Sequence, residues 1–218
     1  MLQKKNKNIF SINPLLTNST IIHFIGIGGM GMSCLAKLLH YYGYNVQGSD
    51  LLDNINIKNL RNEGIHIFLQ HHKNNLKKVK LVVISSAIQD NNPELIAAER
   101  ESIPIIHRSK MLSLLMTFKN SISIAGTHGK TTTTALIAAV LDKYDPTVIN
   151  GGIMNRYNTN LYIGNGKWII VEADESDGTF LKIPTIISII TNIDYDHINY
   201  WHNINNLYNA FIKFVQNI

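Results

Sequence analysis

Blocks of apolar and polar residues alternate along the first half of the chain, and their lengths are those of strands and helices. The run TIIHFIGI at 20–27 is apolar, rich in β-branched residues and ended by glycines, which is typical of a buried parallel strand. The segment MGMSCLAKLLHYY at 30–42 then predicts a helix. The same alternation continues to residue 117, with strands expected at 44–50, 65–69, 80–86 and 103–107 and helices at 54–63, 93–100 and 109–117.

The pattern starts again at TFKN, residues 117–120. A strand at 121–126 precedes a helix at 130–144, and further strands are expected at 146–152, 167–174 and 185–192 before a final helix at 204–216. Alternating strands and helices imply parallel sheets with right-handed crossovers. The sequence therefore predicts an α/β protein with a Rossmann-like domain at 1–118 and a second α/β domain at 119–218.

Composition narrows the class of protein. With 45% hydrophobic and 16% charged residues, a chain of 218 residues can bury a core and should be globular. The 20 Lys and Arg residues against 15 Asp and Glu lie in short scattered runs, which indicates a solvated surface and no nucleic-acid site. A single cysteine, Cys34, excludes an internal disulfide, and no apolar run has the length of a signal peptide or a membrane span. These features predict a cytoplasmic protein.

The first glycine-rich loop follows the first expected strand. Gly26, Gly28 and Gly31 fit the spacing G-x-G-x-x-G, and Asp50 ends the second expected strand. Such glycines permit a tight turn and close backbone approach, and the helix N-terminus favours a diphosphate, with Asp50 as an acceptor for a ribose hydroxyl. The loop fits an NAD enzyme or another diphosphate ligand, and glycines kept only for tight packing are the structural alternative.

The second glycine-rich loop, GTHGKT, lies between a strand and a helix, as a P-loop does. Gly126 and Gly129 leave backbone N–H groups free for phosphates, Lys130 would neutralise phosphate charge, and the Thr131 hydroxyl can bind Mg²⁺. Ile124 stands where a full Walker motif has glycine, which argues against ordinary GTPases and motor ATPases. A threonine-rich helix start with an incidental lysine is the alternative.

Acidic clusters follow two of the later strands. EADESD at 172–177 and TNIDYDH at 191–197 should lie at the same sheet edge as the second loop, because the carboxyl ends of parallel strands converge there. Glu172 or Asp174 could then hold Mg²⁺, with His197 as a ligand to a second ion. Charges that only cap strands are the alternative. His71 and His72 have no partner cluster in the sequence and are expected at the surface.

Taken in order and spacing, these motifs identify a family. The segments HFIGIGGMGMS, SSAI, AGTHGKTTTT, VINGG, EADESDGTFL and TNIDYDH closely resemble those of the Mur ligases, from about residue 20 to the end. The histidine in GTHGKT and the DESD sequence are similar to the member of that family that adds L-alanine. The resemblance implies that the first loop receives a UDP-sugar and the second receives ATP.

The reaction implied is amide formation in peptidoglycan precursor synthesis. The carboxylate of UDP-N-acetylmuramate takes the γ-phosphate of ATP to give an acyl phosphate, which the amine of L-alanine attacks. Lys130 would stabilise the transferring phosphoryl group, Thr131 and Glu172 would hold one Mg²⁺, and His197 would help to hold a second. The implied ATP-binding residues are Gly126, Thr127, His128, Gly129, Lys130, Thr131 and Thr132, and the implied UDP-sugar-binding residues are Gly26, Gly28, Gly29, Gly31, Asp50 and Ser86.

The resemblance covers only part of the family's architecture. Mur ligases have a UDP-binding domain, an ATPase domain and a C-terminal domain, whereas this sequence stops at FVQNI, within the second. The expectation is therefore an incomplete P-loop ATPase domain, with a second polypeptide as a possible source of the missing parts. A non-catalytic UDP-muramate-binding module at 1–118 and an NAD-dependent oxidoreductase remain as alternatives.

Overall fold

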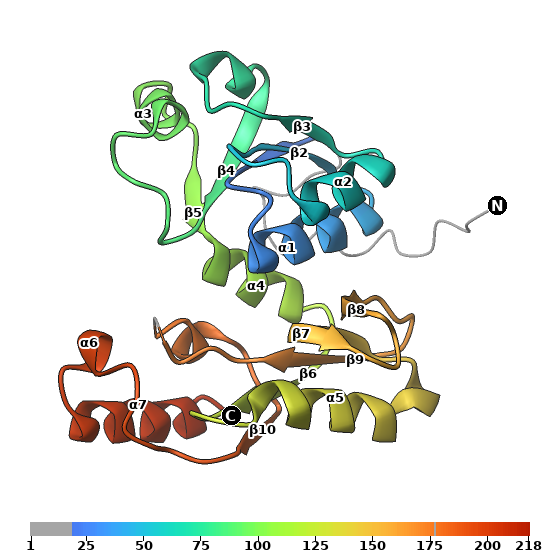
Figure 1. Cartoon of the computed structure of the whole chain (residues 1–218), viewed down its shortest axis with the longest axis vertical. Helices are drawn as coiled ribbons and strands as arrows, with labels where there is room; N and C mark the ends of the chain where they lie inside the picture. The colour runs from blue at the N-terminus through green and yellow to red at the C-terminus, as the bar shows by residue number, and fades with distance from the viewer. Residues whose placement is uncertain (1–18, 177) are drawn as a thin grey trace. The chain divides into compact units, whose positions relative to one another are not determined.

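Two compact units make up the chain, Met1–Met111 and Leu112–Ile218. A computed structural model describes residues 19–176 and 178–218 of the protein. Each unit contains one five-stranded sheet with its own covering helices (Figure 1). The division falls within helix α4 (Arg108–Met116), close to the boundary at 118 that the sequence suggests.

The first unit is an open, fully parallel sheet in the order β3-β2-β1-β4-β5. Helix α1 packs against β2 and α2, whereas α3 packs on the short helix η2. Strand β1 lies between β2 and β4, so the strand order reverses beside it. In such sheets ligands bind outside the carboxyl ends of the strands at this point. The elements are β1 (Ile21–Ile25), α1 (Met30–Tyr41), β2 (Asn45–Ser49), α2 (Ile55–Asn62), β3 (His66–Phe68), η2 (Lys73–Leu76), β4 (Val79–Ile84), α3 (Pro93–Arg100) and β5 (Ile105–His107).

The second unit has the strand order β10-β6-β9-β7-β8. Strands β10, β6, β9 and β7 pair in parallel, as the sequence predicts. The elements are β6 (Asn120–Ala125), α5 (Lys130–Val140), η3 (Asp142–Tyr144), β7 (Thr147–Met154), β8 (Thr159–Tyr162), β9 (Trp168–Glu172), η4 (Thr179–Lys182), β10 (Ile187–Ile190), α6 (Ile198–Trp201) and α7 (Ile204–Gln216).

One strand of this sheet departs from the sequence-based expectation. Strand β8 pairs antiparallel with β7 and was not predicted. Its sequence TNLY is only four residues long and half polar, so it lacks the apolar run that marks the buried parallel strands. The antiparallel pairing adds one strand to the sheet beyond β7 through a short connection, without a crossover helix.

Alternating side chains of the central strands supply two cores in the second unit. Ile170 of β9 joins Ile122, Ile124 and residues of α5 and β7, whereas its neighbours Ile169 and Val171 join a cluster built around η4 and α7. This alternation is the period of a strand covered on both faces. The carboxyl ends of β6, β9 and β10 are therefore fixed at one edge of a packed sheet.

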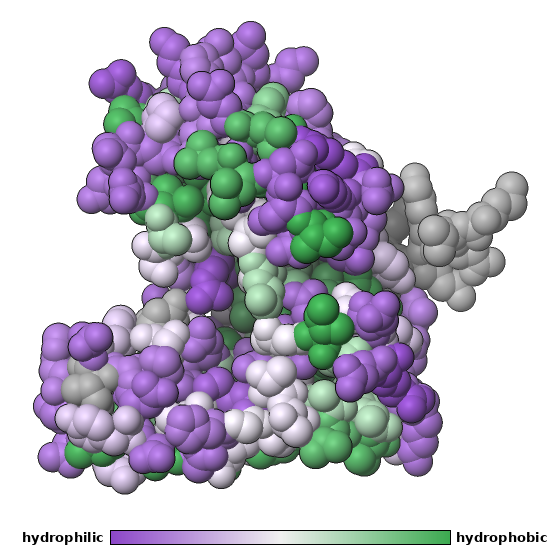
Figure 2. Space-filling view, viewed as in Figure 1, coloured by the Kyte–Doolittle hydropathy of each residue, from purple (hydrophilic) through white to green (hydrophobic). Residues whose placement is uncertain are grey.

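Apolar side chains reach the surface singly and in small groups among polar ones (Figure 2), as on most protein surfaces. Within residues 19–176 and 178–218, no helix combines the length and hydrophobicity that a membrane-spanning helix needs.

Candidate functional site

The first glycine loop is fastened to the end of β2. The amides of Gly26 and Ile27 both donate to the carbonyl of Ser49, at 2.8 and 3.0 Å. The amide of Gly28 donates to Asp50 Oδ2 at 2.8 Å. Helix α1 follows with Gly29 at its N-cap and no side-chain cap, so the backbone amides of its first turn face the loop. The arrangement is a ready anion site at the reversal point of the sheet.

Of the glycines in this loop, Gly28 is the one where an added Cβ would come closest to its neighbours. A Cβ there would lie 2.9 Å from Asp50 Oδ2 and 3.0 Å from atoms of Asn54 and Ile57. We expect Gly28→Ala to lower the free energy of unfolding by about 1–3 kcal/mol, because overpacking forces neighbours apart. Urea unfolding measures the effect. Gly29→Ala is the matched control, since its nearest contact would be 3.5 Å, and an equal loss in both variants would contradict the steric argument.

A buried polar network lies below this loop, centred on Glu94 of α3. The Glu94 side chain is fully buried and accepts hydrogen bonds from Ser49 Oγ at 2.5 Å and Asn75 Nδ2 at 2.6 Å. His23 Nε2 and His71 Nδ1 lie 3.4 and 3.2 Å from its Oε2. Burial acts to raise the pKa of Glu94, but the contacts with His23, Ser49 and Asn75 outweigh it and hold that pKa below its ordinary value.

This network corrects one expectation. His71 was expected at the surface, but its side chain is only 13% exposed and takes part in the Glu94 cluster, whereas His72 is exposed. Its partners, Ser49 and Glu94, come from distant segments that the sequence pattern alone does not bring together. The cluster links β1, β2 and α3, so it fixes the strand end that holds the first loop.

The remaining candidates of the first site lie at the same sheet edge. Ser86 is exposed in the turn after β4. Arg108, which the sequence analysis did not select, lies over the loop, because a Cβ on Gly31 would be 3.2 Å from its Nη1. A guanidinium there adds positive charge to a site suited to a diphosphate.

The second loop is shaped by glycines in conformations that other residues adopt only with strain. Gly126 has φ +130° and Gly129, the N-cap of α5, has φ +80°. A Cβ on Gly126 would lie 2.1 Å from Thr191 Oγ1. Helix α5 begins without a side-chain cap, so the amides of its first turn, which includes Lys130, Thr131 and Thr132, are directed at the loop.

The segment after β10 holds this loop from the other side. Asn192 accepts from the amides of Thr127 and His128 through its carbonyl and side-chain oxygens, and its Nδ2 donates to the His128 carbonyl at 2.9 Å. Thr191 Oγ1 also donates to that carbonyl, at 2.6 Å. The Asp194 amide donates to Thr127 Oγ1 at 2.9 Å, and the same hydroxyl donates to the Asp194 carbonyl at 3.5 Å. The loop is therefore built by two chain segments rather than one.

Glu172, at the end of β9, contacts two parts of the second site. Its Oε1 accepts from Thr131 Oγ1 at 3.0 Å and its Oε2 accepts from the Gly151 amide at 2.6 Å. Gly151 has to be glycine for this approach, because a Cβ would lie 2.6 Å from Glu172 Oε2. A hydroxyl and a carboxylate oxygen at this spacing are the ligand types that Mg²⁺ takes beside nucleotide phosphates.

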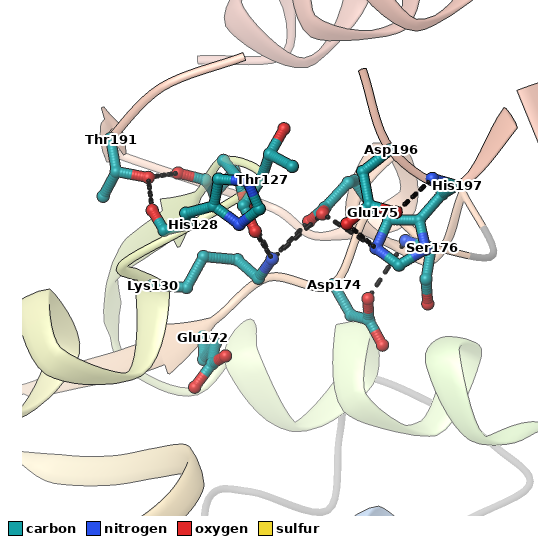
Figure 3. A network of polar contacts seen from close by, with 12 residues as sticks. Thr127, His128, Lys130, Glu172, Asp174, Glu175, Ser176, Thr191, Asp196 and His197 are labelled. Atoms are coloured by element: carbon teal, nitrogen blue, oxygen red, sulfur yellow. Dashed lines mark hydrogen bonds and ion pairs between the residues drawn. The ribbon is translucent and has the colours of Figure 1, made fainter. Parts of the chain in front are cut away.

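Lys130 and His197 contact the Glu175 side chain from opposite sides (Figure 3). Lys130 Nζ lies 2.9 Å from both carboxylate oxygens of Glu175 and donates to the carbonyls of Gly126 and Thr127 at 2.6 and 3.2 Å. His197 Nε2 lies 3.5 Å from Glu175 Oε1. Glu175 is fully buried, and this burial raises its pKa despite the opposing effect of Lys130.

The structure places the second loop in contact with both acidic segments, residues 172–177 and 191–197, through their described residues. It places Glu172 beside Thr131 and His197 beside Glu175, so the residues expected at the two metal ions contact different carboxylates. Their roles stay predictions. Among the described residues, no group of three His, Cys, Asp or Glu side chains is arranged to hold a metal ion. The pair Thr131 and Glu172 fits a Mg²⁺ ion that keeps water and phosphate ligands.

Sequence reasoning missed Glu175, Gly151 and Asn192. Glu175 stands within DESD, but nothing in its spacing separates it from the neighbouring acids of the same segment. Gly151 and Asn192 lie within expected strands and within the motifs VINGG and TNIDYDH, but neither residue was given a role. The signals that could have found them are a paired glycine and a side-chain amide at the carboxyl ends of parallel strands.

Comparison with known proteins agrees with this geometry. The model of the Mur ligase family, catalytic domain, matches residues 21–120, and that of the Mur ligase middle domain matches residues 124–218. The chain belongs to the Mur ligase family. The first glycine loop lies in the first matched region and the GTHGKT loop in the second, so both loops fall within family domains.

Relatives within the Mur ligases are similar over nearly the whole chain. A protein of Brucella anthropi named UDP-N-acetylmuramate–L-alanine ligase is 52% identical over 203 residues, and one of Brucella ovis with the same name is equally similar. A crystal structure of UDP-N-acetylmuramate-alanine ligase from Thermotoga maritima superposes with a TM-score of 0.83 at 37% identity, covering 90% of this chain and 47% of that one. A Neisseria meningitides ligase at 24% identity and a TM-score of 0.84 shares the fold.

The relatives are longer than this chain. The aligned region is 92% of this chain but 43% of the Brucella proteins, so the chain spans less than half the length of these Mur ligases.

Proposed function

We propose that this chain carries the UDP-sugar site and most of the phosphate site of an ATP-dependent ligase that joins L-alanine to UDP-N-acetylmuramate. The observation that supports this most directly is the second loop, where Lys130, the Thr131–Glu172 pair and His197 lie together at the carboxyl ends of β6, β9 and β10. The 52% identity to proteins named for that reaction favours this member of the family.

In this proposal the first loop binds the diphosphate of the UDP-sugar. The α1 amides and Arg108 provide positive charge, and Asp50, which accepts from the Gly28 amide, orients the loop toward the ribose. These groups bind and orient the substrate; they take no part in bond making.

The second loop would position the phosphates of ATP, which supplies the γ-phosphoryl group that turns the muramate carboxylate into an acyl phosphate. A free carboxylate is a poor acyl donor because oxide would have to leave, and phosphorylation removes that obstacle. Lys130 would neutralise charge on the transferring group, and Thr131 and Glu172 would hold Mg²⁺. His197 is the proposed ligand of a second Mg²⁺. The protein's contribution is positioning and charge neutralisation.

A partner polypeptide is part of the same proposal. Strand β10 ends the sheet order and, among the described residues, pairs only with β6. Ile186 and Ile187 are 54% and 43% exposed there, and Ile212 of α7 is 55% exposed. A parallel edge flanked by apolar side chains accepts a further strand. In this proposal a second polypeptide covers this edge of the sheet.

Thermal unfolding in the presence of ligands tests the proposal. A ligand that binds only the folded protein raises its apparent stability, by about 2.7 kcal/mol at a hundred times its Kd. We expect stabilisation by UDP-N-acetylmuramate and, separately, by Mg-ATP. Stabilisation by the UDP-sugar alone would leave a binding module without a nucleotide site. Stabilisation by NADH and by neither expected ligand would replace the proposal with an oxidoreductase.

A further inference from the structure

Glu175 has a set of contacts that no role assigned so far requires. Its side chain is fully buried, although it lies in the segment between β9 and η4, where the neighbouring Asp174 is partly exposed. A buried carboxylate without partners is costly, so the partners it keeps are informative. Those partners are Lys130 from the second loop and His197 from the segment after β10.

The backbone of Glu175 is held as firmly as its side chain. Its carbonyl accepts from Trp201 Nε1 at 3.0 Å and from the Gly178 amide at 3.2 Å. Trp201 lies one helical turn after His197 in α6, and its amide donates to the His197 carbonyl. His197 itself has φ +54°, a conformation that a non-glycine residue keeps only when its surroundings enforce it. The turn after β9 and the start of α6 are thus joined at two points, one through the carboxylate and one through the backbone.

The ammonium group of Lys130 has three protons to donate. Two contact the carbonyls of Gly126 and Thr127, which belong to the loop itself, and Glu175 accepts from Lys130 on the side away from them. The ammonium can turn these two N–H donors from the loop carbonyls to phosphate oxygens while its ion pair with Glu175 stays in place. Within the described residues, no hydrogen bond or ion pair joins Lys130 to His197 directly; both reach Glu175.

We propose that Glu175 is a positioning residue of the nucleotide site, whose single buried carboxylate sets the places of Lys130 and His197 together. The functional part of this inference rests on the proposed function, whereas the coupling between the two side chains does not. A change at Lys130 is then transmitted to His197 through Glu175.

The coupling is measured on the chain without ligands, from the imidazole NMR signals of His197, which are assigned by their loss in His197→Asn. We expect Lys130→Met to shift these signals in the otherwise natural chain but not in a Glu175→Gln chain, where the charge is gone and the shape is kept. An equal response in both backgrounds overturns the proposal. If Glu175→Gln does not fold, Glu175→Asp is used instead. The aspartate side chain is one methylene shorter, so the shift of the His197 signals caused by Lys130→Met should be smaller in this background. A shift of unchanged size overturns the proposal.

Nucleotide binding gives the second readout. We expect Glu175→Gln to weaken Mg-ATP binding about tenfold, the size of one charge-assisted hydrogen bond, with Glu175→Asp between the two and UDP-sugar binding unchanged. Asp142→Asn is the control: its exposed carboxylate pairs with Arg156 beyond the end of α5 and touches neither Lys130 nor Glu175, and a change of no more than about twofold is expected. Natural affinity in Glu175→Gln overturns the proposal. If the natural chain itself binds no Mg-ATP, the proposed function fails, and the His197 signals still decide the coupling.

Discussion

Lys130→Ala should remove measurable Mg-ATP binding while UDP-N-acetylmuramate binding stays at its natural value. Lys130 is the cation inside the second loop, and its ammonium contacts the carbonyls of Gly126 and Thr127 and the carboxylate of Glu175. Loss of two charge-assisted hydrogen bonds to phosphate lowers affinity at least about 100-fold. Isothermal titration with each ligand measures the difference.

Two further variants separate binding from folding. Lys130→Ala leaves Glu175 buried without a counter-charge, so some loss of stability is expected. The double variant Lys130→Ala with Glu175→Gln removes both charges and should recover part of that stability without recovering Mg-ATP binding. Lys182→Ala, at an exposed lysine of η4, should bind both ligands normally. Loss of both ligands in Lys130→Ala, or Mg-ATP affinity within about threefold of the natural chain, would contradict the assignment.

The second large effect is expected at Glu94, on stability. Glu94→Gln turns one acceptor oxygen of the buried network into a donor, facing groups such as Ser49 and Asn75 that now donate to it. Breaking a buried charged network by changing one member costs about 3 kcal/mol or more. Urea unfolding should show this loss, and Glu99→Gln, an exposed position on the same helix, should change stability by less than about 0.5 kcal/mol.

The pH dependence of stability follows from the same residue. The pKa of Glu94 is below its ordinary value of 4.5 in the folded chain, since its hydrogen-bond partners outweigh burial. The contribution to stability is therefore present above pH 4.5 and is lost as the pH falls through the lowered pKa. We expect the stability difference between the natural chain and Glu94→Gln to shrink below that pH. A difference that stays constant down to strongly acidic pH would show that the carboxylate charge is not what the network uses.

Local pattern was enough to predict most of the fold. The strands β1, β4 and β9 are mainly apolar runs, which is how a strand buried on both faces is recognised, whereas β6 alternates serine and isoleucine before a glycine. Strand β8 was not predicted because it is short and half polar, and its pairing depends on β7. Propensity is weak where neighbouring strands decide the outcome.

The site residues also differ in whether local sequence was enough to predict them. Lys130, Thr131 and Glu172 lie in short motifs whose chemistry is visible in sequence, and the structure brings all three together. Glu175 and His71 could not be placed, because what distinguishes them is burial beside residues from distant segments. Burial of a single acid or histidine is a property of the packed fold, and no spacing in the sequence encodes it.

The separate sheet of each unit has a consequence for cooperativity. Two sheets with their own cores can melt as two blocks, in which case one midpoint does not describe the chain. The loop after β1 belongs to one block and the loop after β6 to the other. A scanning calorimeter would then register each ligand in its own heat-absorption peak, so the chain itself reports which loop has been filled.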